Sequence, residues 1–169
     1  MTRPTADSLV KALATGTPEA FAALYDRLGR SLLRVAGVML RDASEAEDAV
    51  QDVFVQVARR AEQLRHVENL DAYVFAMLRN LVKHRLHARQ RERQRLRERP
   101  ARVIQAAGPF QEDLDDALAS LPDEQREVIS LKVDGGLTFA EIAEVLGINA
   151  NTAASRYRYA LEKLRSALE

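Results

Sequence analysis

Five side chains near the C-terminus have the types and spacing needed to bond the edges of nucleic-acid bases. Apolar residues recur with helical spacing at Ala153, Tyr157, Ala160, Leu164 and Leu168, which should face a core. The spacing leaves one polar face: Asn151, Thr152, Ser155, Arg156 and Tyr159. Amide, hydroxyl and guanidinium groups pair with base edges in the major groove of DNA. The face lies near the start of its helix, where recognition helices read bases.

The preceding segment, "TFAEIAEVLGIN", carries signals for a short helix and a tight turn. Thr138 and Glu141 fit a capping box, which satisfies backbone N–H groups at a helix start. Gly147 suits the left-handed position that ends a helix, and Asn149 is a good N-cap for the next one. The pattern predicts a DNA-reading helix-turn-helix. The alternative is a helical hairpin whose polar face is merely solvated.

A second candidate surface lies in "SEAEDAVQDVFVQVARR", where Ser44 and Glu47 match another capping box. Residues spaced i, i+3, i+4 and i+7 share one helix face. Here that face is acidic with one apolar member: Asp48, Gln51, Asp52 and Val55. Such a face suits docking onto a basic helical surface. The alternative is an ordinary solvated face.

A third candidate is the basic segment "LRNLVKHRLHARQRERQRLRERPAR". From Arg79 to Arg102 there are ten Lys or Arg and two Glu, although the whole chain has 25 basic and 25 acidic residues. Arginine binds phosphate with two donors, so this block predicts polyanion binding. Tyr73 and Phe75, just upstream, have rings that could stack on exposed bases. Their alternative is core packing, which we favour for Phe75. The alternative for the basic block is a solvated helix with ion pairs to Glu92 and Glu98.

Other function classes find little support in the sequence. His84 and His87 are three residues apart, but without Cys or a suitably spaced carboxylate they do not predict a metal site. We find no catalytic Ser/His/Asp set and no Gly-rich phosphate loop, so we expect no cofactor and no small-molecule substrate. The chain has no long apolar run and no secretory signal pattern. We therefore expect a cytoplasmic protein without direct membrane insertion.

The elements that carry these surfaces are predicted to be helices. Pro is absent between residues 18 and 100, and no stretch alternates with period two. Thr17 and Asn69 can cap long helices. The prediction is an all-α protein with two small helical domains joined by a flexible linker. Its boundaries are 1–99, 100–112 for the linker, and 113–169.

Four segments in this order resemble a bacterial RNA polymerase sigma factor of the sigma-70 family, and the two-domain layout resembles the extracytoplasmic-function (ECF) type. The segment 20–42 resembles the opening of region 2, and 44–59 resembles its polymerase-binding part. The segment 70–86 resembles the part that melts and reads the −10 element. The segment 121–165 resembles region 4 and is the most specific of the four.

The resemblance implies a function, partners and roles for single residues. It implies a protein that binds core RNA polymerase, directs promoter-specific initiation, is regulated by an anti-sigma factor and is not itself an enzyme. The face Asp48, Gln51, Asp52 and Val55 would dock on the coiled coil of the largest polymerase subunit. The −10 contacts would be Tyr73, Asn80, Lys83, His84, Arg85, His87 and Arg89. The −35 contacts would be Asn151, Thr152, Ser155, Arg156 and Tyr159.

The sequence also departs from the family pattern. Tyr73 stands where Trp is usual, and His84 where an acidic residue is usual. Ala154 and Tyr159 replace a common Lys and a common Arg. The departures at His84, Ala154 and Tyr159 keep open a second class, a sigma-like decoy that sequesters polymerase or an anti-sigma factor. A third class is a helix-turn-helix regulator that binds DNA unaided, although the neutral net charge and the weakened recognition helix argue against it.

Overall fold

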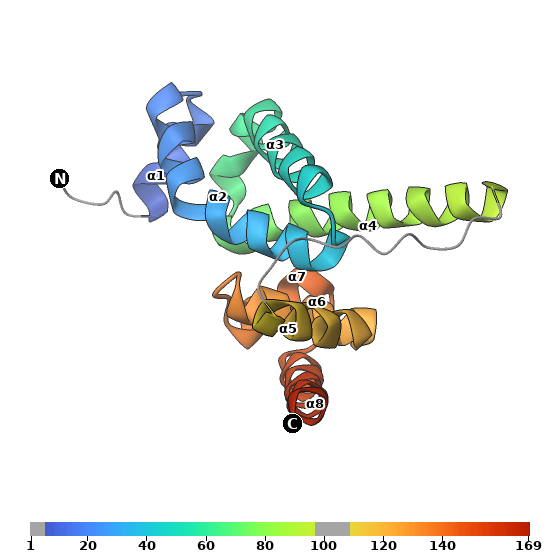
Figure 1. The fold of residues 1–169 in the computed structure, drawn as a ribbon. Coiled ribbons are helices and arrows are strands. Elements are labelled where there is room, and N and C mark those ends of the chain that lie inside the picture. Colours follow the sequence, from blue (N-terminus) through green and yellow to red (C-terminus); the bar gives the residue numbers. More distant parts are fainter. Residues whose placement is uncertain (1–5, 97–108) are drawn as a thin grey trace.

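The computed structural model describes residues 6–96 and 109–169, and all regular structure within those ranges is helical (Figure 1). The first group of elements is α1 Ala6–Ala14, α2 Pro18–Leu40, α3 Ala43–Arg59, the 3₁₀ helix η1 Ala61–His66 and α4 Leu70–Leu96. The second group is α5 Pro109–Ser120, α6 Asp123–Val133, α7 Phe139–Leu146 and α8 Ala150–Leu168. The all-α prediction is confirmed.

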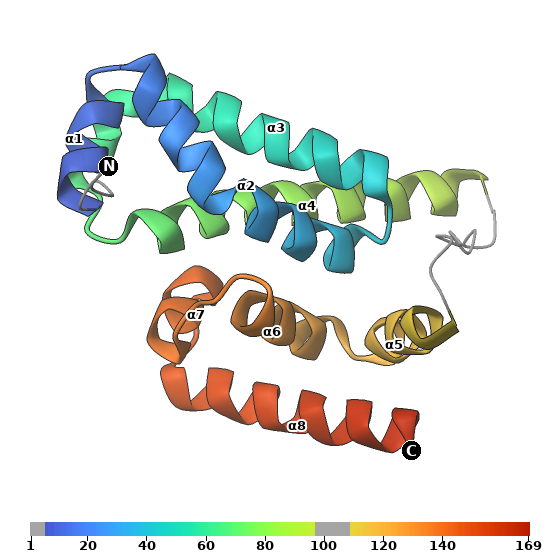
Figure 2. The same ribbon diagram turned by 60° about the vertical axis from the view of Figure 1, so that its left-hand side comes forward.

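The first group forms a bundle in which α2 and α4 pack against α3 (Figure 2). Each helix contributes apolar residues at helical spacing, and burial of this stripe holds the bundle together. Fully buried members include Leu24 and Leu32 of α2, Val53 of α3 and Leu78 of α4. The polar residues between these positions are left on the outside, where the candidate surfaces lie.

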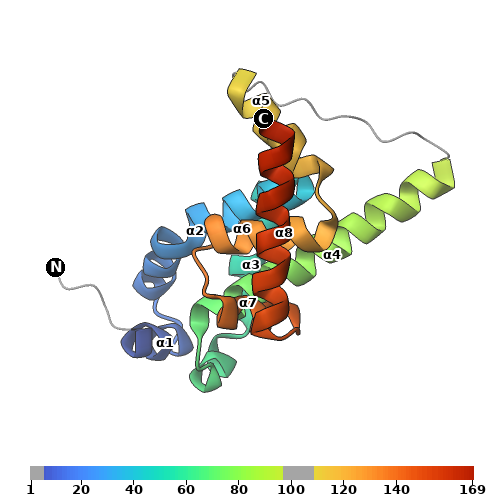
Figure 3. The ribbon, with the colours of Figure 1, turned by 90° about the horizontal axis from the view of Figure 1, so that it is seen from below.

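The second group places α8 against α5, α6 and α7. Figure 3 shows α8 crossing α6. Ala153, Ala160 and Leu164 of α8 are buried, as predicted from their spacing. Leu168 was predicted to face the core, and this is wrong: it is exposed in the last turn of the helix. Tyr157 is half-buried and packs its ring against Phe139, with 5.5 Å between ring centroids.

Several predicted helix ends are confirmed. Thr138 and Glu141 form a complete capping box, and Gly147 ends α7 with a φ of 67°. Such a positive φ favours glycine, because a side chain there would be strained. The Asn149 side chain accepts a hydrogen bond from the Thr152 N–H at 2.8 Å. The Asn69 side chain accepts one from the Ala72 N–H at 3.0 Å.

Two other caps differ from the prediction. The capping box at Ser44 is wrong, because α3 begins at Ala43 and its N-cap is Asp42, whose carboxylate accepts a hydrogen bond from the Glu45 N–H at 2.8 Å. Thr17 does occupy the N-cap of α2, but its side chain makes no cap hydrogen bond. Its hydroxyl instead lies 3.0 Å from that of Thr15.

The predicted linker, 100–112, overlaps the second group of helices. Helix α5 begins at Pro109, so the last four residues of that segment are helical. Proline suits the first turn of a helix because the N–H it lacks would have no intrahelical partner there. The remainder of the predicted linker lies outside the described residues.

The two groups of helices pack directly on each other, which the sequence does not predict. Contacts join α4 to α7 and α2 to α6. One apolar cluster runs through both groups and includes Leu131 and Ile142 from the second. Arg79 Nε donates to Glu127 Oε1 at 2.6 Å, and Asn69 Nδ2 donates to Glu141 Oε1 at 2.8 Å. We call this arrangement the closed form.

Candidate nucleic-acid interface

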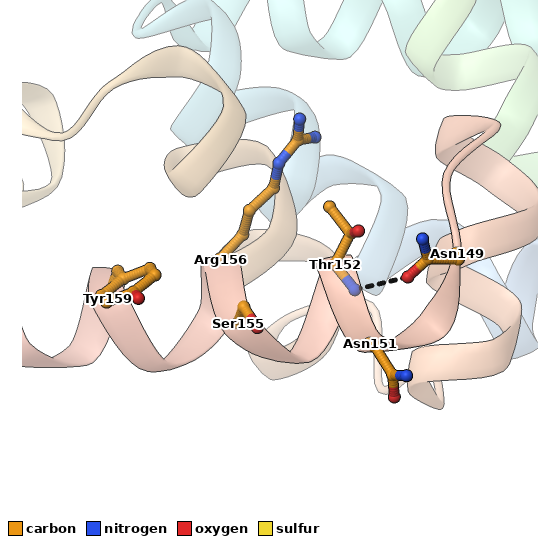
Figure 4. A pocket seen from close by; sticks show the side chains of 6 residues that line it. All are labelled: Asn149, Asn151, Thr152, Ser155, Arg156 and Tyr159. Atoms are coloured by element: carbon orange, nitrogen blue, oxygen red, sulfur yellow. Dashed lines mark hydrogen bonds between the residues drawn. The ribbon is translucent and has the colours of Figure 1, made fainter.

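The first turns of α8 carry an open hollow. It is lined by Asn149 and by all five side chains of the predicted polar face: Asn151, Thr152, Ser155, Arg156 and Tyr159 (Figure 4). The Asn149 cap fixes the start of the helix and so sets which residues face outward. The structure thus brings the predicted −35 residues together on one surface.

These residues differ in how freely they face solvent. Asn151 and Tyr159 are exposed, whereas the Arg156 side chain is only 25% exposed. Arg156 Nη2 pairs with Glu124 Oε2 on α6 at 2.8 Å. Arg158, the sequence neighbour of Tyr159, is exposed, and its guanidinium lies 5.5 Å from the centroid of the Tyr159 ring. It supplies a positive charge beside the position where Tyr159 replaces the family's common Arg.

The predicted −10 residues divide between two sides of α4. Residues seven apart share a helix face, so Tyr73, Asn80 and His87 lie along one side. Lys83 and His84 belong to the same side, and Asn80, His84 and His87 are exposed. Tyr73 is half-buried against the core. This side therefore offers polar groups to solvent.

Arg85 and Arg89 lie on the other side of α4, toward α3. Arg85 Nη2 pairs with Asp52 Oδ2 at 2.6 Å. Arg89 donates to the Leu40 carbonyl at 3.0 Å and also pairs with Glu45. The Arg85 pair thus connects α4 to α3, and the Arg89 contacts connect α4 to the corner between α2 and α3. The sequence alone gave no sign of them, since the partners are 33 or more residues away.

The acidic face of α3 is on the surface of the bundle. Asp48, Gln51 and Val55 are exposed, and Asp52 is half-exposed while paired with Arg85. Beside this face, Tyr25 of α2 is 57% exposed. Its ring packs on Phe54 at a centroid distance of 5.1 Å. The sequence analysis missed Tyr25, because its position beside α3 depends on how the two helices pack.

A second hollow lies between the two groups of helices. From the first group it is lined by Met39, Lys83, Leu86, His87 and Gln90, and from the second by Asp123, Glu124, Arg126 and Glu127. The start of α6 thus presents carboxylates toward the basic helix α4. Arg126 also holds the end of α5 by donating to the carbonyls of Leu118, Ala119 and Leu121.

Two carboxyl groups near the contact between the two groups of helices have shifted pKa values. The Thr138 backbone N–H and, next, the Asn69 side chain bond Glu141 and lower its pKa. Burial raises the pKa of Asp134, and the positive charge of Arg34 on α2 partly offsets this effect. The pKa of each carboxyl group is thus affected by a residue of the first group of helices, Asn69 for Glu141 and Arg34 for Asp134.

Each of the two groups of helices matches a known family model. Residues 24–92 match the family model for sigma-70 region 2, and residues 111–164 match the model for sigma-70, region 4. The chain is 32% identical to the ECF RNA polymerase sigma factor SigK of Mycolicibacterium vanbaalenii, over 96% of this chain and 88% of that protein. This chain belongs to the ECF sigma factors of the sigma-70 family. It is also 29% identical to SigK of Mycobacterium ulcerans, over 96% of this chain and 93% of that one.

Two solved structures resemble most of the chain. CnrH in complex with the cytosolic domain of CnrY has a TM-score of 0.77 and 25% identity, and the match covers 96% of both chains. The sigma factor RpoE of Bartonella quintana, in complex with the anti-sigma factor NepR, has a TM-score of 0.71 and 27% identity. That match covers 86% of this chain and 96% of RpoE.

As an ECF sigma factor, the chain binds core RNA polymerase and promoter DNA and directs promoter-specific transcription initiation. Among the residues that the structure describes, no three His, Cys, Asp or Glu gather where they could hold a metal ion. Nor is any helix in the described ranges long and apolar enough to cross a membrane.

Proposed function

We propose that this sigma factor reads the −35 element through the hollow at the start of α8. The observation that supports the proposal is that all five side chains of the predicted face line one open hollow. They offer amide, hydroxyl and guanidinium groups, which pair with base edges in the major groove. The capping box of α7 and the Asn149 cap hold this helix-turn-helix in a defined geometry. The proposed contacts are Asn151, Thr152, Ser155, Arg156 and Tyr159.

The −10 element is proposed to meet the exposed side of α4. Asn80, His84 and His87 are exposed there, with Lys83 alongside and Tyr73 at the upstream end. Polar groups and an aromatic ring suit a base that is captured out of the stack. Arg85 and Arg89 are tied to α3 and to the corner before it, so their part in DNA binding is proposed to be electrostatic rather than direct.

The core polymerase is proposed to bind the α3 face made by Asp48, Gln51, Asp52 and Val55. Charged groups at the edge of such a contact speed association, and exposed apolar groups add burial. Val55 is 47% exposed and Tyr25 stands beside the face, so both apolar groups can be covered on docking. A basic helical surface, such as a coiled coil of the largest polymerase subunit, is the complementary partner.

Three further assignments complete the proposal. Residues 1–99 form the unit that binds polymerase and the −10 element, 113–169 form the unit that binds the −35 element, and 100–112 join them, with the second unit's first helix starting inside that joint. The chain catalyses no reaction itself. An anti-sigma factor regulates it, supported by the likeness to RpoE, which was solved with the anti-sigma factor NepR.

Transcription in vitro tests the proposed function. Core polymerase, with and without the chain, transcribes a library of templates randomised at the −35 and −10 positions. We expect transcripts only when the chain is present, enriched for particular sequences at both positions. Tight specific duplex binding without polymerase would instead indicate a stand-alone regulator. Polymerase binding with no transcript from any template would indicate a decoy.

A further inference from the structure

Arg156 is the one strong cationic group among the proposed −35 contacts, and it is held by a residue outside them. We propose that Glu124 is a positioning residue for sequence reading. By holding the Arg156 guanidinium, it limits sequence-independent phosphate binding and so widens the discrimination between promoters. This inference rests on the proposed role of α8 in reading the −35 element.

The geometry of the pair supports this role. Arg156 Nη2 lies 2.8 Å from Glu124 Oε2, and the pair joins α8 to the first turn of α6. The Arg156 side chain is 25% exposed although it belongs to an otherwise open hollow, whereas Glu124 is 68% exposed. In Figure 4, the Arg156 side chain points away from that of Asn151, although both line the hollow. The guanidinium is therefore turned toward α6.

A guanidinium held in this way behaves differently from a free one. Arginine has five N–H donors in a rigid fork, and an unrestrained fork can reach any nearby phosphate. Phosphate contacts add affinity that is independent of sequence and depends on salt. A donor already bonded to Glu124 is withdrawn from such contacts, while the other donors stay available at a fixed place. A donor that is held at one place discriminates between bases, because it bonds only a base whose acceptor atom lies within reach of that place.

The start of α6 offers a matched control. Asp123 is the neighbouring carboxylate, its side chain is 92% exposed, and it pairs with Arg126 rather than with Arg156. Asp123→Ala therefore removes the same charge from the same helix end without touching α8. If Glu124 merely repelled DNA phosphates, the two substitutions would have similar effects.

The experiment measures holoenzyme affinity for a promoter selected from the randomised library and for the same template with a scrambled −35 element. The proteins are the wild type, Glu124→Ala, Asp123→Ala, Arg156→Ala and the Glu124→Ala/Arg156→Ala double variant. We expect Glu124→Ala to bind the scrambled template severalfold more tightly, with less gain on the selected template. The salt dependence should steepen by about one unit, as for one added phosphate contact.

The double variant decides whether the effect passes through Arg156. We expect Glu124→Ala to have no effect in the Arg156→Ala background and Asp123→Ala to leave discrimination as in the wild type. An unchanged discrimination in Glu124→Ala, or an equal effect with and without Arg156, would overturn the positioning role. Thermal unfolding of each variant checks that the fold is intact.

The outcome also separates this inference from the proposed function. If the wild-type holoenzyme does not discriminate between selected and scrambled −35 elements, the role of α8 itself is wrong. If the wild type discriminates but Glu124→Ala does so equally well, the proposed function stands and the inference fails.

Discussion

Two arginines of α4 that look alike in sequence have different surroundings in the structure. Arg89 donates to the Leu40 carbonyl and pairs with Glu45, whereas Arg91 is exposed. A composition argument treats both as phosphate-binding groups. The contacts of Arg89 indicate a role in the stability of the first group of helices, whereas the exposed Arg91 is the one that we expect to contact DNA phosphates.

We therefore predict that Arg89→Ala destabilises the protein by about 1–3 kcal/mol, because it leaves the Glu45 carboxylate and the Leu40 carbonyl without this donor. Arg91→Ala should leave unfolding unchanged and reduce the salt slope of holoenzyme–promoter binding by about one unit. Denaturant unfolding and salt titrations measure the two effects. Equal stability of the two variants would contradict the division.

Glu141 makes stability depend on pH. Its pKa is lowered in the folded protein by hydrogen bonds from the Thr138 N–H and the Asn69 side chain. A lowered pKa contributes stability that is fully present above the unfolded value, near 4.5, and is lost as pH falls through the folded value. Glu141→Gln should thus cost stability at pH 7 and progressively less below pH 4.5. Denaturant unfolding of both proteins across this range would show a constant gap if the prediction is wrong.

The start of α3 depends on one N-cap residue. Because the Asp42 carboxylate accepts the Glu45 N–H, Asp42→Ala should destabilise the protein by about 0.5–2 kcal/mol. Ser44→Ala, two residues on, should change stability little, since Ser44 is exposed inside the helix. Thermal unfolding compares the two variants. A larger loss for Ser44→Ala would favour the capping box expected from the sequence.

The faces of α3 can be tested separately from its start. Asp48→Arg reverses one exposed charge, so it should weaken co-purification with core polymerase and leave unfolding unchanged. Asp52→Arg should also weaken binding, but it places a second cation beside Arg85 and should lower stability as well. Unchanged polymerase binding by both variants would remove this face from the proposed contact.

Contacts within one element could be predicted from the sequence, whereas contacts between distant segments could not. Caps such as Thr138 with Glu141, and Asn149, were predictable because their partners lie within three residues. The α8 face followed from helical spacing alone. The Glu124–Arg156 pair and the division of α4 into two sides depend on side chains that folding brings together from distant parts of the chain.

With the proposed −10 contacts on α4 and −35 contacts on α8, we expect that the closed form does not bind both promoter elements at once. The positions −35 and −10 differ by about 25 base pairs. This spacing is roughly 85 Å along the duplex, at about 34 Å per ten base pairs. In the closed form α4 and α7 are in contact. We therefore predict that the two groups of helices separate when the sigma factor binds a promoter within the holoenzyme.

Energy transfer between two dyes measures this separation. The chain has no Cys, so dyes attached through Ser44→Cys and Ser166→Cys, both at exposed positions, report the distance between domains. Transfer should fall when the labelled chain joins polymerase and promoter. In the free chain, Glu127→Ala should also lower transfer, because it leaves Arg79 unpaired at the contact. Glu144→Ala, an exposed change on α7, should not. Transfer unaffected by polymerase would contradict opening.

The apolar cluster shared by the two domains has a consequence for solubility. Leu131 and Ile142 are almost completely buried in the same cluster as the first domain's core. A chain that opens away from its partners exposes part of this surface to water, and exposed apolar patches favour self-association. Opened variants such as Glu127→Ala should aggregate at lower protein concentration than the wild type, and added core polymerase should suppress this. We therefore expect the closed form to keep the unbound sigma factor monomeric, and polymerase to cover the apolar surface that opening exposes.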